Sequence, residues 1–245
     1  MEKNVRKPVI AGSWYPGDPG VLTRDIKEYL KKVPGDGVGG RVVGLISPHA
    51  GYLYSGQIAA HGYKLIQGQR FDSVIVIGPS HRSVFRGASV YPSGGYETPL
   101  GVVPVDGDLA DRIIGHGGSI SYYPQAHLQE HSIEIQLPFL QRSLEGKFSL
   151  LPLMMRAQDS TAVDAVSHSL TPILQGYDSL VIASSDLSHF YPQDIANALD
   201  GHLLQMVTDF SPDGVLKAEA EGSGFACGAG PIAVLLSTAR QAGAD

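Results

Sequence analysis

The sequence predicts an α/β protein in which a largely parallel sheet is covered by helices on both faces. The first observation is a set of short, uninterrupted apolar runs, such as VVGLIS at 42–47 and SVIVIG at 73–78, which are typical of strands buried on both sides. The second is that segments with helical periodicity separate these runs. The third is that we find no repeat, low-complexity tract or linker, so residues 1–245 are predicted to form one domain.

The first half of the chain contains three well-marked elements. Residues 21–33 place apolar side chains at helical spacing, with acidic residues before basic ones as the helix dipole prefers. RVVGLIS at 41–47 is a predicted strand. The segment 55–68 is a predicted helix, with Ser55 as its N-cap and Gly68 as its end.

The remaining elements continue the alternation of strands and helices. A buried strand is predicted within 71–81, followed by an amphipathic helix over 128–144 and a strand over 148–155. Another buried strand is predicted within 178–189, and a late helix over 230–243. This order favours crossover connections and therefore a largely parallel sheet.

Three of the predicted strands end in the same way. GLISPH ends at His49, VIVIGPSH at His81 and VIASSDLSH at His189, each after a short turn of small residues. Ligands of open α/β sheets bind at the carboxyl ends of the strands, and imidazole is a common metal ligand. A single histidine at a strand end more often satisfies only a local hydrogen bond. Three with the same pattern favour a shared metal site.

Two further segments contain residues that suit a functional site. Glu130, His131 and Glu134 lie in the predicted helix, with the last two on one face, but their spacing is not the HExxH zinc signature and also fits a solvated first turn. Cys227 lies among glycines just before a helix, where a thiol has a lowered pKa, although a free cysteine is usually a small buried hydrophobe. The glycine-rich segment around Cys227 lacks the Lys-Ser/Thr of a Walker motif, and no GxGxxG follows a predicted strand, which argues against nucleotide binding.

Composition excludes several classes of protein. The formal net charge of -6, with scattered Lys and Arg, gives no electrostatic basis for binding nucleic acid. No apolar run approaches the ~18 residues that cross a bilayer, and the first residues lack the apolar core of a secretory signal. One cysteine excludes an internal disulfide and fits a reducing compartment. We therefore expect a cytoplasmic protein without a membrane or nucleic-acid partner.

Several motifs, in one order along nearly the whole chain, give it a family resemblance. They are RKPVIAGSWYPGD, SPHAGYLYSGQIAAHGY, VIVIGPSHR, YETPLGVVPVD, EHSIEIQLPFLQ, SSDLSHF and ACGAGPI. With these motifs the chain resembles the Memo family, also called AmmeMemoRadiSam system protein B. The resemblance implies the fold of class III extradiol dioxygenases, a three-layer α/β/α sandwich around a mixed, largely parallel sheet. Family members normally continue into further strands where this sequence ends in QAGAD, so we expect those C-terminal strands to be lacking.

The resemblance also implies a metal site and the roles of its residues. The dioxygenases hold Fe(II) with two histidines and a carboxylate. Here His49 and His81 match the histidines, and Cys227 takes the place of the carboxylate. His189 matches the acid/base histidine, with Asp186 close to it. The expected metal is iron or copper, with zinc as a further fit, because a thiolate favours soft and borderline ions.

Glu130 and His131 are expected to orient this site through hydrogen bonds without binding the metal. Three functions remain open from the sequence. The first is a metal-dependent oxidoreductase or dioxygenase-like enzyme acting on a small aromatic diol. The second is a non-enzymatic adaptor that binds metal or a peptide in the same pocket, as suggested by a eukaryotic relative linked to phosphotyrosine signalling. The third, a zinc hydrolase, lacks the spacing of known zinc proteases. The family resemblance further implies AMMECR and radical SAM partner proteins.

Overall fold

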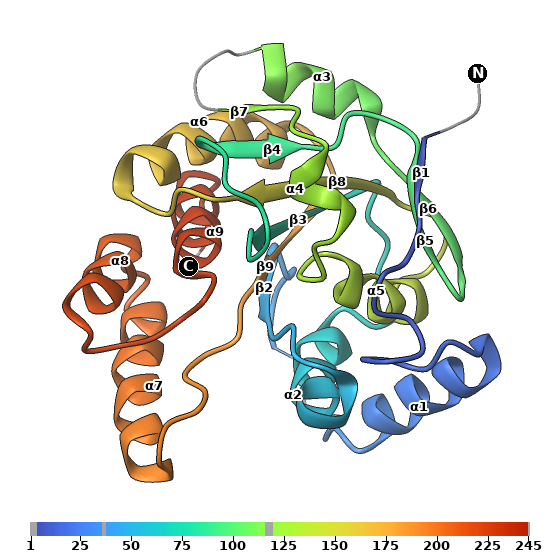
Figure 1. Ribbon diagram of the computed structural model, residues 1–245, viewed down its shortest axis with the longest axis horizontal. Coiled ribbons are helices and arrows are strands. Elements are labelled where there is room, and N and C mark those ends of the chain that lie inside the picture. The colour runs from blue at the N-terminus through green and yellow to red at the C-terminus, as the bar shows by residue number, and fades with distance from the viewer. Residues whose placement is uncertain (1–3, 36–37, 116–119, 245) are drawn as a thin grey trace.

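The computed structural model describes residues 4–35, 38–115 and 120–244, and its centre is a six-stranded sheet in the order β2-β9-β3-β8-β4-β7 (Figure 1). Neighbouring strands are parallel except for the antiparallel pair β4 and β8. The predicted mixed, largely parallel sheet is therefore confirmed. The strands are β2 (Gly44–Ser47), β3 (Ser73–Pro79), β4 (Ala88–Val90), β7 (Ile120–Ser121), β8 (Ser149–Met155) and β9 (Ser179–Ser184).

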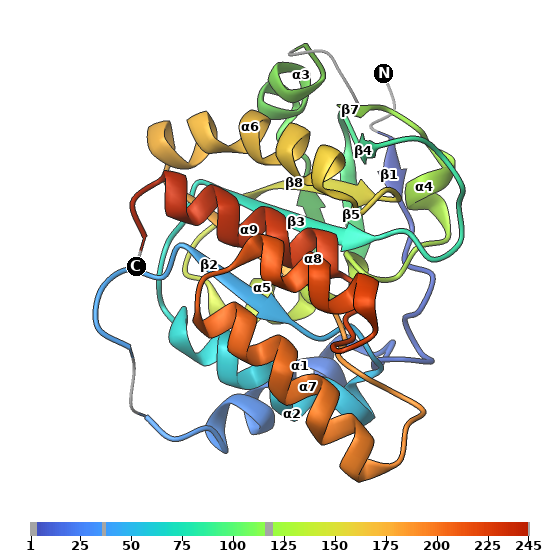
Figure 2. The ribbon, with the colours of Figure 1, turned by 90° about the vertical axis from the view of Figure 1, so that its left-hand side faces the viewer.

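Helices cover both faces of this sheet, because alternate residues of each strand point to opposite sides. Val74 and Val76 belong to one apolar core, whereas Ile75 and Ile77 belong to the other. Figure 2 shows the second face, where the C-terminal helices lie in front of the strands. The three-layer α/β/α arrangement is thus confirmed. The first core contains side chains of α1 (Pro19–Lys31), α2 (Tyr52–Leu65) and α5 (Leu137–Ser143), and the second contains those of α6 (Ser160–Gly176), α7 (Gln193–Thr208), α8 (Pro212–Glu221) and α9 (Ala229–Gln241).

A small second sheet holds the N-terminal segment beside the main one. Its strand order is β1-β5-β6. Strand β1 is parallel to β5, and β6 is antiparallel to β5. A Cβ at Gly94 would lie 1.9 Å from the carbonyl oxygen of Asn4, so only glycine allows this close approach. The described chain also contains β1 (Val5–Arg6), β5 (Gly95–Thr98), β6 (Gly101–Pro104), α3 (Gly107–Gly115) and α4 (Gln125–Leu128).

The predicted N-cap of α2 is wrong. The helix begins at Tyr52, and its N-cap is Gly51, whereas Ser55 lies inside the helix and donates its hydroxyl to the carbonyl of Ala50 at 2.8 Å. The cause is a contact from elsewhere in the chain. The amide of Tyr52 donates to the carbonyl of Trp14 at 2.8 Å, which satisfies a first-turn amide without a side-chain cap.

The predicted continuous helix over 128–144 is also wrong. After α4 ends at Leu128 the chain is irregular, and it becomes helical again only in a 3₁₀ turn (Glu134–Gln136) and then α5. The carboxylate of Glu130 accepts hydrogen bonds from the amides of His131 and Ser132 at 2.8 and 3.1 Å, which gives these amides a partner outside any helix. His131 and Glu134 therefore do not share a helix face.

Candidate metal centre

Three strands that are adjacent in the sheet, β2, β9 and β3, end at one edge and place polar side chains there. His49 follows β2 by two residues, Asp186 follows β9 by two, and His81 follows β3 by two. The strand ends were predicted from their apolar runs, and their adjacency in the sheet explains why these side chains meet.

Three histidines form the centre of the site. The ligand atoms of His49, His81 and His131 all lie within 4.8 Å of one another. His49 and His131 are buried, whereas the side chain of His81 is 33% exposed. Nitrogens bound at ~2.0–2.1 Å to one metal ion lie at most ~4.2 Å apart, so these ligand atoms need only small side-chain movements to reach a single ion.

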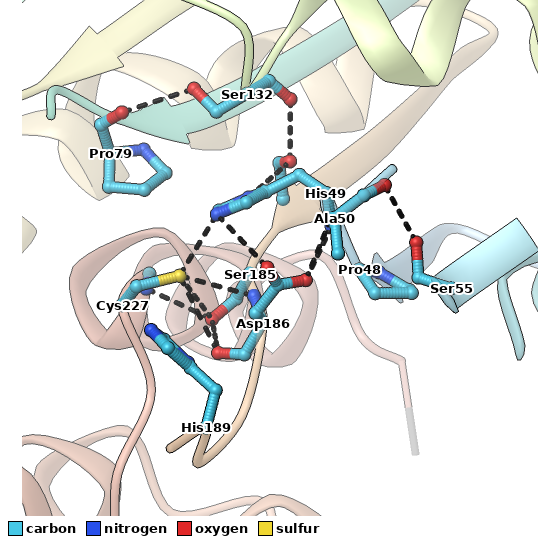
Figure 3. A network of polar contacts seen from close by, with 12 residues as sticks. Pro48, His49, Ala50, Ser55, Pro79, Ser132, Ser185, Asp186, His189 and Cys227 are labelled. Carbon is cyan, nitrogen blue, oxygen red and sulfur yellow. Dashed lines mark hydrogen bonds and ion pairs between the residues drawn. The ribbon is translucent and has the colours of Figure 1, made fainter. Parts of the chain in front are cut away.

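Cys227 lies beside this cluster, at the turn that leads into α9 (Figure 3). Its Sγ is 3.0 Å from Nε2 of His49, and the amide of Asp186 donates to the sulfur at 3.2 Å. Burial raises the pKa of the Cys227 thiol, but the hydrogen bonds of His49 and His81 outweigh burial and lower the pKa to about 6. The sulfur is therefore mainly a thiolate at neutral pH, which is the form that binds metals.

Glu130 holds His81 in place. Its carboxylate accepts from the amide of His81 at 2.6 Å and lies 3.0 Å from Nδ1 of the same residue. A carboxylate accepts the Nδ1 proton, so Nε2 of His81 is left for the site. Hydrogen bonds with Cys227 and then Glu130 raise the pKa of His81 to about 10. Burial raises the pKa of Glu130, but hydrogen bonding and charge from His81 and His131 lower it to about 2.

Asp186 orients the loop that carries His49. Its Oδ1 accepts from the amides of His49 and Ala50 at 2.7 and 3.1 Å, and its Oδ2 lies 3.9 Å from Nε2 of His49 (Figure 3). One carboxylate oxygen thus holds the turn after β2, and the other faces the site.

His131 contributes more to the cluster than its sequence position suggested. Its ring packs on Trp14, with centroids 4.4 Å apart, and its Nδ1 lies 3.1 Å from Glu130 without making a hydrogen bond. Burial is the main cause that lowers the pKa of His131 to about 4, so the ring is neutral at pH 7. A neutral, buried imidazole with a spare nitrogen has the chemistry of a metal ligand. Sequence reasoning assigned His131 only a supporting role.

His189 is exposed and lies at the border of the site. Its Nδ1 donates to the carbonyl of Leu187 at 2.9 Å, and its ring packs at the edge of Phe225, with centroids 5.2 Å apart. Figure 3 draws the ring below Cys227, apart from His49. With its proton on Nδ1, the ring has Nε2 free to accept a proton.

A buried ion pair behind the site was not visible in the sequence. Arg6 and Glu134 are 2.7 Å apart with side chains 1% and 0% exposed. Arg6 also donates to the carbonyls of His127 and Glu130, so it holds the segment that carries His131. Glu134 accepts from the amides of Val9 and Ile10 and from the hydroxyl of Tyr15. No local pattern reveals a pair separated by 128 residues.

The fold and the cluster define an α/β protein with a candidate centre of imidazole and thiol groups at the carboxyl edge of its sheet. Imidazole and thiolate suit copper, iron or zinc, whereas magnesium and calcium prefer oxygen ligands. The orphaned Nδ1 of buried His131 also fits a bound ion.

Comparison with known proteins identifies the family. A family model described as Memo-like protein matches residues 6–245, and the chain belongs to the Memo family. A MEMO1 family protein of Methanothermobacter thermautotrophicus is 36% identical over 98% of this chain and 90% of its own length. Relatives from Nitrosopumilus maritimus and Thermoplasma volcanium are 32% and 33% identical, each over 98% of this chain and 89% and 88% of their own lengths. Within the described residues, no helix is long and apolar enough to cross a membrane.

Proposed function

We propose that this protein binds one iron or copper ion between His49, His81, Cys227 and His131 and uses it in oxidation–reduction chemistry. One observation carries the proposal. Side chains from four separate segments converge, with Cys227 Sγ 3.0 Å from His49 and the three imidazoles within 4.8 Å. Ligands that bind one ion at ~2.0–2.3 Å lie at most ~4.6 Å apart, so small side-chain movements bring these atoms within reach of one ion.

The chain's own residues have distinct tasks in this proposal. Glu130 directs Nε2 of His81 into the site, and the amide of Asp186 stabilises the Cys227 thiolate. His189 has its Nε2 free to take a proton from a substrate hydroxyl at the border of the site. A bound iron or copper ion supplies one-electron chemistry and polarises a ligated oxygen. The substrate class we propose is a small aromatic diol, because a hydroxyl group can both ligate and give up a proton.

The thiolate separates this site from a two-histidine, one-carboxylate site. Sulfur donates more charge to a metal than a carboxylate oxygen does, and it favours Cu(I) as well as Fe(II). Catechol cleavage is therefore only one of the reactions to be assayed, together with reduction of oxygen. A zinc hydrolase is disfavoured, because the carboxylates of Glu130 and Glu134 are both buried in hydrogen bonds within the chain.

A second candidate function, a peptide-binding adaptor, is favoured by aromatic side chains next to His189. Phe190 is fully exposed at 101% and adopts a left-handed backbone with φ 68°, and Tyr191 is 46% exposed. A non-glycine residue in this conformation is strained, and such strain is found mainly at functional sites. An adaptor of this kind binds its peptide equally well with and without a metal chelator.

The test is metal analysis of protein purified without added metal, followed by anaerobic titration with Fe(II) and Cu(I). Trp14, the single tryptophan, packs on His131, so its fluorescence reports binding at this site. We expect one ion per chain, a fluorescence change at that stoichiometry, and loss of both in His49→Ala. The control is His61→Ala, which removes an exposed histidine from α2. Equal binding by wild type and His49→Ala, or no binding by either, would contradict the proposal.

A further inference from the structure

The hydroxyl of Ser184 lies at the meeting point of three polar groups next to the candidate metal centre. Ser184 is the last residue of β9 and is fully buried. Its Oγ lies 2.6 Å from the carbonyl oxygen of Ser132, 2.8 Å from Nε2 of Gln136 and 3.0 Å from Nδ1 of His49. A hydroxyl can donate one hydrogen bond and accept two, so once its one donated bond is assigned, it must be the acceptor in the other two contacts.

The proton of Ser184 is committed to Ser132. A carbonyl oxygen only accepts, and the distance of 2.6 Å makes this the shortest of the three contacts. The serine oxygen must therefore accept from both of its other neighbours.

The orientation of Gln136 agrees with this assignment. Its Oε1 accepts from the hydroxyl of Tyr63 at 2.8 Å, and its Nε2 donates to the carbonyl of Pro48 at 3.0 Å. Exchanging the amide nitrogen and oxygen would place the oxygen against that carbonyl, so Nε2 is the atom next to Ser184. Gln136 therefore donates one hydrogen bond to the serine oxygen.

The remaining lone pair of Ser184 accepts from His49. Nδ1 of His49 then carries a proton that it donates to Ser184, and Nε2, the atom 3.0 Å from Cys227, faces the site. In the metal-free protein Nε2 and the Cys227 sulfur share a second proton, and a bound metal ion would take the place of that proton. We propose that Ser184 is a positioning residue that holds His49 in the tautomer with its proton on Nδ1, so that Nε2 is available as a metal ligand. This inference rests on the proposed metal-binding function.

The same serine links two parts of the site. Its donated proton holds the carbonyl of Ser132, which directly follows His131 in the chain. The orientation of His49 and the position of the turn that carries His131 thus depend on one hydroxyl group. Loss of that group affects the direction of two candidate ligands without removing either of them.

Ser47 provides a matched control for a test. It is opposite Ser184 in the register of β2 and β9, it is 1% exposed, and its hydroxyl has no hydrogen-bond partner among the described residues. Ser184→Ala and Ser47→Ala therefore remove the same atom from the same depth, but only Ser184→Ala removes a contact to His49. Ser184→Thr, which keeps the hydroxyl, should behave like wild type.

The first measurement is Zn²⁺ affinity, determined by competition with a chromophoric chelator. We expect Ser184→Ala to bind about 10–100-fold more weakly, as for other groups that orient metal ligands. Ser47→Ala should stay within about twofold of wild type, because it breaks no hydrogen bond. Equal affinities of the two alanine variants would overturn the proposal, as would a loss in Ser184→Ala that Ser184→Thr shares.

The second measurement is the tautomer of His49 in the metal-free protein, read from long-range ¹⁵N–¹H NMR spectra at a pH where the ring is neutral. Wild type and Ser47→Ala should show the proton on Nδ1, and Ser184→Ala should show a substantial population with the proton on Nε2. An unchanged tautomer in Ser184→Ala would overturn the proposal whatever the affinity. If wild type binds no Zn²⁺, Fe(II) or Cu(I), the proposed function fails, and the tautomer alone then decides the role of Ser184.

Discussion

Two buried histidines, His127 and His131, lie four residues apart in the chain and have different surroundings. They are 1% and 8% exposed. Both ring nitrogens of His127 have protein partners, Nδ1 with the hydroxyl of Tyr96 at 2.8 Å and Nε2 with that of Ser89 at 3.0 Å. His131 instead has an Nδ1 that makes no hydrogen bond within the described part of the chain. Its ring packs against His81, with centroids 4.8 Å apart.

The difference shows which property separates a structural histidine from a candidate ligand. Burial does not separate them, and neither does the direction of the pKa, which burial lowers to about 3 for His127 and about 4 for His131. What separates them is whether the protein itself satisfies both nitrogens. A buried ring whose nitrogens are both bonded has completed its hydrogen-bonding capacity, whereas one with a spare nitrogen can take a further partner.

The largest effect is expected from Arg6→Met, which removes the side chain that holds the segment of both histidines. Glu134 would keep its buried charge without a countercharge, and the carbonyls of His127 and Glu130 would lose their donor. We expect a loss of about 3–5 kcal/mol in the free energy of unfolding, measured with urea. The control Lys7→Met breaks an exposed pair with Glu97 and should cost at most about 1 kcal/mol. Similar losses in both variants would mean that Arg6 has no special role.

The comparison itself is tested by the pair His127→Gln and His131→Gln. His127→Gln removes the rigid ring that bridges the buried hydroxyls of Ser89 and Tyr96, so it should cost about 1–3 kcal/mol of stability and leave metal affinity unchanged. His131→Gln should do the reverse, with a metal affinity at least about tenfold weaker and a smaller change in stability. The measurements are urea unfolding of the metal-free proteins and titration with Fe(II). If both variants change stability and metal affinity in the same way, the hydrogen-bond partners of a buried histidine do not tell a structural role from a metal-binding role.

Cys227→Ser extends the comparison from imidazole to thiol. It replaces a soft thiolate with a hydroxyl of nearly the same volume, so Cu(I) affinity should fall by at least a factor of about ten, or ~1.4 kcal/mol. The thermal midpoint without metal should change little, because volume is conserved. Calorimetric titration and a melting curve on one preparation test both statements. A destabilised variant with unchanged affinity would identify Cys227 as a core thiol.

The last prediction sharpens the comparison through pH. Burial, followed by the charge of Arg6, lowers the pKa of His127 to about 3. An unfolded histidine has a pKa of ~6.5, so below that pH the unfolded state binds more protons than the folded state. The stability from His127 is complete above the unfolded pKa and is lost as pH falls toward the folded one, by up to about 1.4 kcal/mol per pH unit.

The measurement is urea unfolding of metal-free wild type and His127→Gln between about pH 7 and pH 5, a window that lies above the range in which Glu130 titrates. The curve of stability against pH should be flatter for His127→Gln. Parallel curves would show that His127 is protonated equally in both states.

Much of the fold and half of the site could be predicted from local pattern. The apolar runs that became β2, β3 and β9 located the strands and, two residues beyond two of them, His49 and His81. Glycines around Cys227 marked the turn before α9. The helix expected over 128–144 failed because the carboxylate of Glu130 bonds the amides of its own segment, and this competition is not expressed in hydrophobic periodicity.

The sequence by itself determined the class of fold, the family and the residues that end the strands. Side chains repeat every two residues in a strand and every 3.6 in a helix, so the order of apolar and polar residues along a short segment indicates which element it forms. Tertiary structure alone decided which histidine has a spare nitrogen. His49 and His127 contact Ser184 and Tyr96, which are 135 and 31 residues away in the chain, whereas Nδ1 of His131 has no hydrogen-bond partner among the described residues. Such pairing depends on the strand order and on chain segments that meet only in the folded protein, so no local pattern contains it.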